Sequence, residues 1–359
     1  MSLELRRVSL RVGAETHIHP TDLVCEPGSF NVLLGTTLAG KTTLMKLMAG
    51  LERPTSGEVH FGGRDVTGVS VRNRNVSMVY QQFINYPNMS VYENIASPLK
   101  VARLPDDEIK RRVGTFAELL RLTPMLGRRP SELSGGQQQR TAMARALVKD
   151  ADLVLLDEPL ANLDFKLREE LRDELPRLFA NRDCIVVYAT TEPVEALLFG
   201  GHTACLFEGR VVQFGPTGEV YRSPLDLTSA QVFSDPPINT AQVTKAGGDF
   251  RLADGGSFPV PAGHAGLADG AYTLGVRPHH VSPAPEGAQP VAIEGDVLVT
   301  ELSGSESIIH FTFHERTWVS QAHGIHPFEV GTRQRLYADM SKALVFDGAG
   351  RRIAGQSTT

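Results

Sequence analysis

A glycine-rich stretch, GTTLAGKT over residues 35–42, constrains the fold more than any other part of the chain. It follows the apolar residues 30–34 and precedes a helical pattern over 41–49, an order typical of a phosphate-binding loop between strand and helix. Backbone N–H groups and the positive end of the helix dipole would hold a nucleotide's phosphates. Lys41 would reach the β- and γ-phosphates, and the Thr42 hydroxyl would hold Mg²⁺. The predicted nucleotide-binding residues are Gly35, Thr36, Thr37, Leu38, Ala39, Gly40, Lys41, Thr42 and Thr43.

A second stretch, LVLLDEP over residues 153–159, reads as a buried strand that ends in two carboxylates. Asp157 is a candidate metal ligand for Mg²⁺, and Glu158 is a candidate general base. Glu158 could instead be a strand-end carboxylate in solvent. Its position beside Asp157, in a chain with a phosphate loop, favours the catalytic interpretation.

Strand and helix patterns alternate through residues 1–234, which predicts an α/β fold with a largely parallel sheet covered on both faces. The expected strands are 30–34, 76–80, 153–156, 185–189 and 204–207, and the expected helices are 41–49, 106–121, 137–149, 166–179 and 194–199. A helical subdomain is expected at about residues 88–150. Near Pro236-Pro237 the pattern changes to short alternating runs, which predict a small β-barrel or sandwich over residues 235–359.

The composition excludes several classes of protein. The net charge is −5 and no basic stripe stands out in the sequence, so nucleic acid is not an expected partner. Cys25, Cys184 and Cys205 are widely spaced in or beside apolar segments, which predicts reduced core residues. No apolar run approaches the ~20 residues of a membrane span, and the N-terminus lacks a signal-peptide pattern. We therefore expect a cytoplasmic protein that reaches a membrane only through partners.

The sequence LSGGQQQR, residues 133–140, predicts a second phosphate site. Ser134 suits a helix N-cap, and Gln137 three residues later completes a capping-box pattern. A capped surface helix would explain these two residues alone. Gly135 and Gly136 in the first turn cost about 1 kcal/mol each against alanine, however. Their use would be a bare helix N-terminus that an anion can approach closely.

With this signature between the two nucleotide motifs, residues 1–234 resemble the nucleotide-binding subunit of an ATP-binding-cassette (ABC) transporter. The resemblance implies a P-loop NTPase domain that hydrolyses ATP with Mg²⁺. It also implies that two such subunits pair head to tail, with ATP between the phosphate loop of one and residues Ser134, Gly135, Gly136 and Gln137 of the other. Two integral membrane permease subunits, and indirectly a solute-binding protein, are the implied partners.

Further positions match the family one at a time. Gln81 matches the glutamine that reaches Mg²⁺ and the attacking water, and Asp164 lies in the loop that crosses the dimer interface. Residues 82–92 occupy the region that usually receives the membrane subunits. Phe83 and Tyr86 could belong to that docking surface or to the local core.

The chain departs from the family pattern at two positions. Thr191 stands where the family normally has a histidine that contacts the γ-phosphate, and a neutral hydroxyl is a shorter donor. Thr191 also suits an N-cap for the helix beginning near Pro193. The family often has an aromatic residue that stacks on adenine, and the matching position here is near Val12, which is not aromatic. His17 and His19 are nearby. These losses predict a weakened site and an asymmetric pair with an unlike, more active ATPase subunit.

Residues 274–281, LGVRPHHV, resemble a motif of the C-terminal oligonucleotide/oligosaccharide-binding (OB)-like domain found in ATPases of carbohydrate importers. Adjacent His279 and His280 make a poor metal site because neighbouring strand residues point to opposite faces. Residues 15–19 and 80–87 resemble ATPases of glycerol and polyol importers. Alternative functions are a soluble non-transport ABC ATPase and a nucleotide-sensing regulatory module.

Overall fold

The computed structural model describes residues 1–355 except Ser29, Asn181 and Asp254. The chain divides into two compact units, Met1–Val220 and Tyr221–Thr359, referred to below as the N-terminal and C-terminal units. Helix α8 (Leu227–Val232) groups with the C-terminal unit because Ala230 packs beside Phe346. The boundary near residue 234 expected from the sequence lies just beyond this helix.

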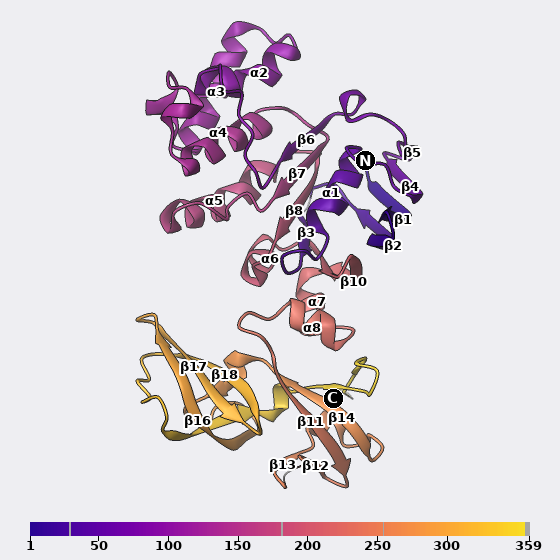
Figure 1. Ribbon diagram of the computed structural model, residues 1–359, viewed down its shortest axis with the longest axis vertical. Coiled ribbons are helices and arrows are strands. Elements are labelled where there is room, and N and C mark those ends of the chain that lie inside the picture. The colour runs from indigo at the N-terminus through magenta and orange to yellow at the C-terminus, as the bar shows by residue number, and fades with distance from the viewer. Residues whose placement is uncertain (29, 181, 254, 356–359) are drawn as a thin grey trace. The chain divides into compact units, whose positions relative to one another are not determined.

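A six-stranded sheet forms the centre of the N-terminal unit, with strand order β10-β9-β3-β8-β7-β6 (Figure 1). Strands β3, β6, β7, β8 and β9 run parallel, and β10 pairs antiparallel with β9. Strands β3, β7 and β8 are buried along their whole length, as expected for a parallel sheet covered on both faces. The strands are β3 Phe30–Leu34, β6 Val76–Val79, β7 Leu153–Asp157, β8 Ile185–Thr190, β9 His202–Phe207 and β10 Arg210–Pro216.

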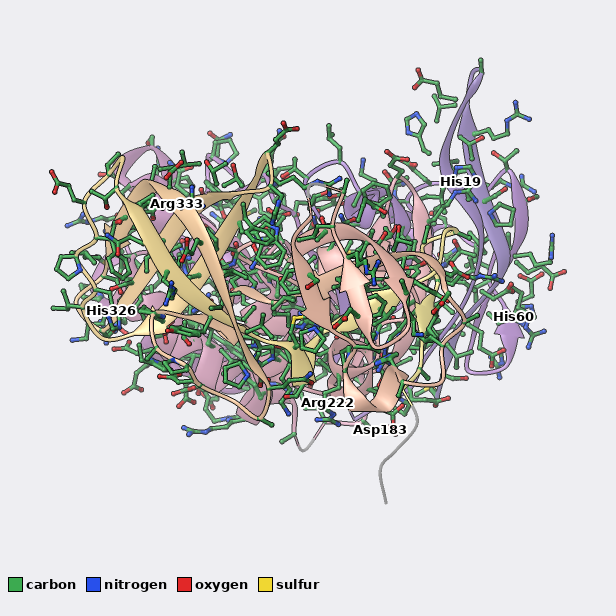
Figure 2. All side chains as sticks on the ribbon, turned by 90° about the horizontal axis from the view of Figure 1, so that it is seen from below. His19, His60, Asp183, Arg222, His326 and Arg333 are labelled. Carbon is green, nitrogen blue, oxygen red and sulfur yellow. The ribbon has the colours of Figure 1, made fainter. Side chains whose placement is uncertain are left out.

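A second, antiparallel sheet in this unit has the order β2-β1-β4-β5, and no strand of it was predicted. Its strands are β1 Leu3–Val12, β2 Glu15–Cys25, β4 Ser56–Phe61 and β5 Arg64–Asp65. Figure 2 labels His19 and His60, which belong to β2 and β4. Helix α1 (Lys41–Ala49) packs between the two sheets, because one apolar core joins its buried residues to both.

The other α-helices in the described part of the N-terminal unit are α2 Val91–Val101, α3 Asp106–Leu119, α4 Gly135–Leu147, α5 Phe165–Phe179, α6 Pro193–Phe199 and α7 Thr217–Arg222, the last crossing into the second unit. Helices α2, α3 and α4 pack on one another as a separate group (Figure 1). All five expected helices are present, whereas α2 was not predicted. The three cysteines are buried, as predicted. Within the described part of the chain, no helix is long and apolar enough to cross a membrane.

The C-terminal unit consists of antiparallel strands around one apolar core that includes Phe250, Phe311 and Trp318. Its two sheets have the orders β13-β12-β11-β14-β20-β21 and β15-β19-β16-β17-β18. In the second sheet the Ser320 hydroxyl of β18 donates to the Val281 carbonyl of β15, which nearly closes a five-stranded barrel. This confirms the predicted small β-barrel. The strands are β11 Asn239–Ala246, β12 Asp249–Arg251, β13 Ser257–Pro259, β14 Gly270–Val276, β15 Val281–Ser282, β16 Pro290–Leu302, β17 Glu306–Phe313, β18 Arg316–His323, β19 Arg333–Asp339, β20 Leu344–Phe346 and β21 Arg352–Ile353.

Candidate functional site

The predicted phosphate loop lies between β3 and α1 and has little room for larger residues. Gly40 has a φ of 103°, in the left-handed region, and a Cβ there would meet Ile18 Cδ1 at 3.0 Å. A Cβ on Gly35 would lie 2.5 Å from the Leu206 carbonyl oxygen. These glycines therefore hold the loop close to its neighbours and leave its inner face open.

Lys41 is a buried cation at the start of α1, with 5% of its surface exposed. Its Nζ donates to the carbonyl oxygens of Gly35 at 2.7 Å and Thr36 at 3.0 Å. The same Nζ lies 3.3 Å from Glu158 Oε1. Burial lowers the pKa of Lys41, and the nearby Glu158 carboxylate opposes that shift. The ammonium group is thus held at the inner face of the loop.

Asp157 ends β7 directly opposite the first turn of α1. Thr42 Oγ1 donates to Asp157 Oδ2 at 2.7 Å, whereas Asp157 Oδ1 is buried with no hydrogen-bond partner among the described residues. Burial raises the pKa of Asp157, because the charged carboxylate loses its hydration there. A buried carboxylate oxygen without a partner is costly, and a cation would satisfy it.

Glu158 follows with a φ of 45°, an uncommon backbone conformation for a residue other than glycine. The Gln81 Nε2 atom, just beyond β6, donates to Glu158 Oε2 at 3.1 Å. The structure therefore brings Gln81, Lys41, Thr42, Asp157 and Glu158 together from three separate segments of the chain. Lys41, Thr42, Gln81 and Glu158 border a cavity of about 480 Å³, and Asp157 contacts Thr42 without belonging to the described lining. The lining is Thr16, His17, Thr37, Leu38, Ala39, Gly40, Lys41, Thr42, Thr43, Gln81, Glu158, Glu208 and Gly209.

The signature residues lie at the N-terminus of α4, where the predicted capping box is present. Ser134 Oγ accepts from Gln137 N at 3.4 Å, and Gln137 Oε1 accepts from Ser134 N at 3.0 Å. No described atom lies within 4 Å of a Cβ built on Gly135, and for Gly136 only the Asn162 oxygen does, at 3.7 Å. This helix end is open to the surface. Among the described residues, those of the signature do not line the phosphate-loop cavity.

Among the predicted positions, Gly35, Thr36, Asp164 and Thr191 also lie outside the described cavity lining. Asp164 caps α5, with its Oδ1 accepting from Leu167 N at 3.0 Å. Thr191 is exposed, and its predicted role as an N-cap is wrong. Glu192 occupies the N-cap of α6, and it is the Thr190 hydroxyl that accepts from Glu192 N at 3.0 Å. The helix begins one residue later than Thr191 would need in order to cap it.

The segment after Gln81 is held at one side and exposed at the other. The Arg145 guanidinium lies 4.7 Å from the centre of the Tyr86 ring and donates to the Ile84 carbonyl. Ile84 is 63% exposed and Tyr86 is 49% exposed. Tyr86 therefore has one face against Arg145 and half of its surface free, so it is not a core residue.

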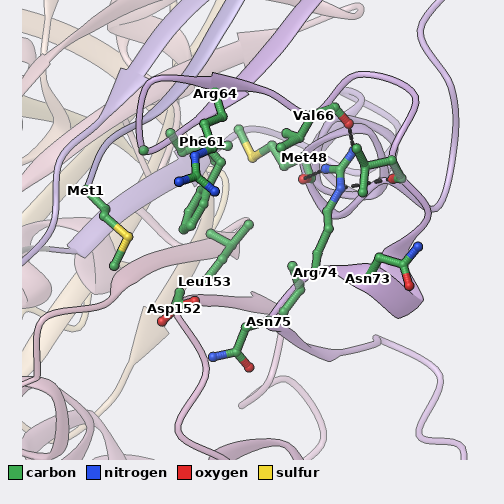
Figure 3. A pocket seen from close by; sticks show the side chains of 14 residues that line it. Met1, Met48, Phe61, Arg64, Val66, Asn73, Arg74, Asn75, Asp152 and Leu153 are labelled. Atoms are coloured by element: carbon green, nitrogen blue, oxygen red, sulfur yellow. Dashed lines mark hydrogen bonds between the residues drawn. The ribbon is translucent and has the colours of Figure 1, made fainter.

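A second cavity, of about 520 Å³, lies at the opposite ends of α1 and β7, where Met48 and Leu153 line it (Figure 3). Arg74 also lines it and donates to the carbonyl oxygens of Met48, Val66 and Val69. The predicted site residues are absent from the described lining of this cavity.

Sequence reasoning missed four residues that line the phosphate-loop cavity. Thr16 and His17 come from β2, and Glu208 and Gly209 form the turn between β9 and β10. His17 was noted only as a neighbour of the expected stacking position near Val12. The Glu208-Gly209 pair after an apolar strand was a turn signal, but nothing local ties that turn to the phosphate loop.

Comparison with known proteins gives a consistent result. The family model for ABC transporters matches residues 18–161. The chain is 41% identical over 285 residues to the sn-glycerol-3-phosphate import ATP-binding protein of Ruegeria pomeroyi, covering 79% of each. It is 36% identical to the protein of the same description from Salmonella typhi, covering 98% of this chain and 99% of that one. It is 37% identical to the xylose/arabinose import ATP-binding protein of Haloferax volcanii, covering 82% and 78%.

Solved structures resemble part of the chain. The post-hydrolysis dimer of the ATP-binding cassette MJ0796, bound to ADP and Pi, aligns with a TM-score of 0.55 at 26% identity. The alignment covers 60% of this chain and 98% of that one.

Proposed function

The chain belongs to the ATP-binding subunits of ABC transporters, and from that premise we propose that it drives import of sn-glycerol 3-phosphate or a related polyol or sugar. The observation that carries the ATPase assignment is the convergence of Lys41, Thr42, Gln81 and Glu158 on one cavity, with Asp157 bonded to Thr42. The cargo class rests on relatives of 36–41% identity that carry such import names. Transport itself requires membrane partners.

The phosphate loop binds the triphosphate through its backbone N–H groups and Lys41. The Lys41–Glu158 contact of 3.3 Å holds both side chains at the cavity until the nucleotide arrives. Phosphate oxygens then take the ammonium, because they are stronger acceptors than the two loop carbonyls. Glu158, which accepts a hydrogen bond from Gln81, takes the proton from the attacking water as general base.

Mg²⁺ fits the residues present, with Thr42, Gln81 and Asp157 as its protein ligands. The unpartnered Asp157 Oδ1 is the atom that supports this placement. One carboxylate suits Mg²⁺, which keeps waters and phosphate oxygens in its shell. The bound ion would neutralise charge on the phosphates.

The subunit acts at the cytoplasmic face of the membrane, paired head to tail with a second ATPase. The open Ser134–Gly136 helix end contacts the ATP held by the partner. Exposed Ile84 and Tyr86 dock on one of two permease subunits, which receive cargo from a solute-binding protein. The partner ATPase is an unlike subunit, because Thr191 provides no cationic donor to the γ-phosphate.

Turnover of the purified chain, alone and with the neighbour-encoded ATPase and permeases, tests this assignment. We expect copurification with the permeases and faster hydrolysis by the mixture. Thr191→His should raise the turnover of the lone chain about tenfold or more, since one donor to developing phosphate charge is typically worth 10²–10³ in rate. Equal rates for chain and mixture, with no effect of Thr191→His, would refute the asymmetric pair. Normal transport by Lys41→Ala would show that only the signature serves the complex.

A further inference from the structure

One end of the phosphate-loop cavity is lined by residues that belong neither to the phosphate loop nor to the Asp157–Glu158 segment. Thr16 and His17 of β2 and the turn residues Glu208 and Gly209 line this end. If the triphosphate occupies the Lys41 end, as the proposed function requires, the base of the nucleotide extends toward a different part of the same cavity. The inference below rests on that proposed function.

The turn is fixed to both the phosphate loop and β2. Gly209 N donates to the Ala39 carbonyl at 3.0 Å, and His19 N donates to the Gly209 carbonyl at 2.9 Å. A Cβ on Gly209 would lie 2.3 Å from the His17 carbonyl oxygen, so the two backbones approach as closely as glycine permits. The base end of the cavity is therefore positioned before any ligand binds.

Glu208 has a φ of 46° in the two-residue turn between β9 and β10. Such turns prefer Asn, Asp or Gly at this position, because other side chains are strained there. Strained conformations of this kind concentrate at functional sites. Glu208 therefore lines the cavity at the expense of local stability.

The expected aromatic platform is absent from this end. Val12 ends β1, is 54% exposed and does not belong to the described lining of the cavity. His17 lines the cavity instead, with 42% of its side chain exposed and its Nε2 atom 3.8 Å from Glu15 Oε2. An imidazole offers a flat π-face against which any base can stack.

We propose that this end of the cavity selects adenine: the His17 ring stacks on the base, and the Glu208 carboxylate accepts a hydrogen bond from its exocyclic amine. Guanine presents a carbonyl oxygen at the equivalent position, which a carboxylate repels. Stacking is tolerant of base identity, whereas the Glu208 contact is not. Glu208 is therefore the specificity-determining residue, and His17 contributes affinity for any purine.

Equilibrium binding of ATP and GTP to the full chain separates these two roles. Glu208→Ala should weaken ATP about tenfold, the usual worth of a hydrogen bond to a charged group, and leave GTP affinity unchanged or improved. Glu208→Gln gives its side chain a donor for the guanine oxygen, so the ATP-to-GTP affinity ratio should also fall. Because Glu208→Gly relieves the left-handed strain, its loss of ATP selectivity with a raised melting temperature would exclude misfolding as the cause.

His17→Ala should weaken ATP and GTP equally, by about fivefold to tenfold. His19→Ala is the matched control, since His19 lies on the same strand outside the described cavity lining and contributes only its backbone to the turn. His17→Phe should restore the lost affinity for both nucleotides.

The outcomes distinguish this inference from the proposed function. If wild type binds ATP, and Lys41→Ala abolishes that binding, the phosphate site stands. An unchanged ATP-to-GTP ratio in the Glu208 variants, or unchanged affinities in His17→Ala, would then overturn the base-end assignment alone. Wild-type ATP binding that Lys41→Ala leaves intact would overturn the proposed function itself.

Discussion

The two ends of α1 and β7 carry two cavities of similar size with opposite chemistry. At one end, buried Lys41 lines the cavity, and an oxygen of buried Asp157 has no partner among the described residues. At the other end, the Arg74 guanidinium donates hydrogen bonds to three backbone carbonyls (Figure 3). Donors satisfied by backbone carbonyls stabilise a fold, whereas a buried carboxylate oxygen without a partner is a candidate ligand atom. Cavity volume alone would not separate the two.

The largest expected effect is at the phosphate-loop cavity, where hydrolysis would take place. Glu158→Gln keeps the size of the side chain and a hydrogen-bond partner for Gln81, but cannot take a proton. Hydrolysis by the assembled complex should fall by about 10²–10⁴, because general-base catalysis contributes that much. ATP binding should persist, since the phosphate loop is unchanged, and single-turnover kinetics with equilibrium binding measures both.

Glu52→Gln is the control for that variant, because Glu52 lies beyond the end of α1 and pairs with Lys46 at 3.4 Å. Its hydrolysis rate should match wild type. Hydrolysis by Glu158→Gln within twofold of wild type would assign the base to another residue and remove the contrast between the cavities.

The phosphate-loop half of this comparison was predictable, because its signals are local. The loop, the β7 carboxylates and the Ser134 capping box each lie within a few residues of sequence, and the structure confirms the strand, the helices and the cap. Helix α2 was missed although Ser90 and Glu93 form a capping box, because Pro98 interrupts the helical pattern.

The N-terminal sheet and the base end of the cavity were not predictable by the same means. Strand β1 changes register with β2 at several points, so its apolar residues do not alternate regularly. Glu208 reaches the cavity through pairing of distant segments, in which Gly209 bonds to both Ala39 and His19. Residues that meet only through tertiary pairing leave no periodic signal in one sequence.

The second prediction concerns Arg74, which lines the other cavity. Arg74→Met keeps much of the apolar stem but leaves the carbonyls of Met48, Val66 and Val69 without these donors. The free energy of unfolding should fall by about 2–4 kcal/mol, because each unsatisfied buried group costs about 1–3 kcal/mol and water reaches some of them. Urea unfolding measures the loss, and ATP affinity of the folded chain should not change.

Arg72→Met, at an exposed neighbouring position, should change stability by no more than about 0.5 kcal/mol. A large loss of ATP affinity in Arg74→Met without loss of stability would instead show that the second cavity communicates with the phosphate loop.

The smallest expected effect concerns Asp157, whose buried charge should destabilise the fold while no cation is bound. Asp157→Asn removes a charge whose pKa burial raises, while the Asn oxygen can still accept from Thr42. A raised carboxyl pKa means that the folded chain holds the proton to higher pH than the unfolded chain does. Wild-type stability therefore falls as pH rises from the unfolded-state pKa through the folded-state pKa, and Asp157→Asn lacks this contribution.

Above that window the Asn variant should be the more stable protein without nucleotide, by about 1 kcal/mol, at the expense of Mg²⁺-dependent hydrolysis. Urea unfolding from about pH 4 to about pH 7 should show the difference between variant and wild type growing with pH and then levelling. Added Mg²⁺ and ATP should reverse the order, because only the wild-type carboxylate gains a cation at its unpartnered oxygen. A variant less stable than wild type throughout would mean that Asp157 is satisfied within the fold, as Arg74 is, and the distinction between the two cavities would fail.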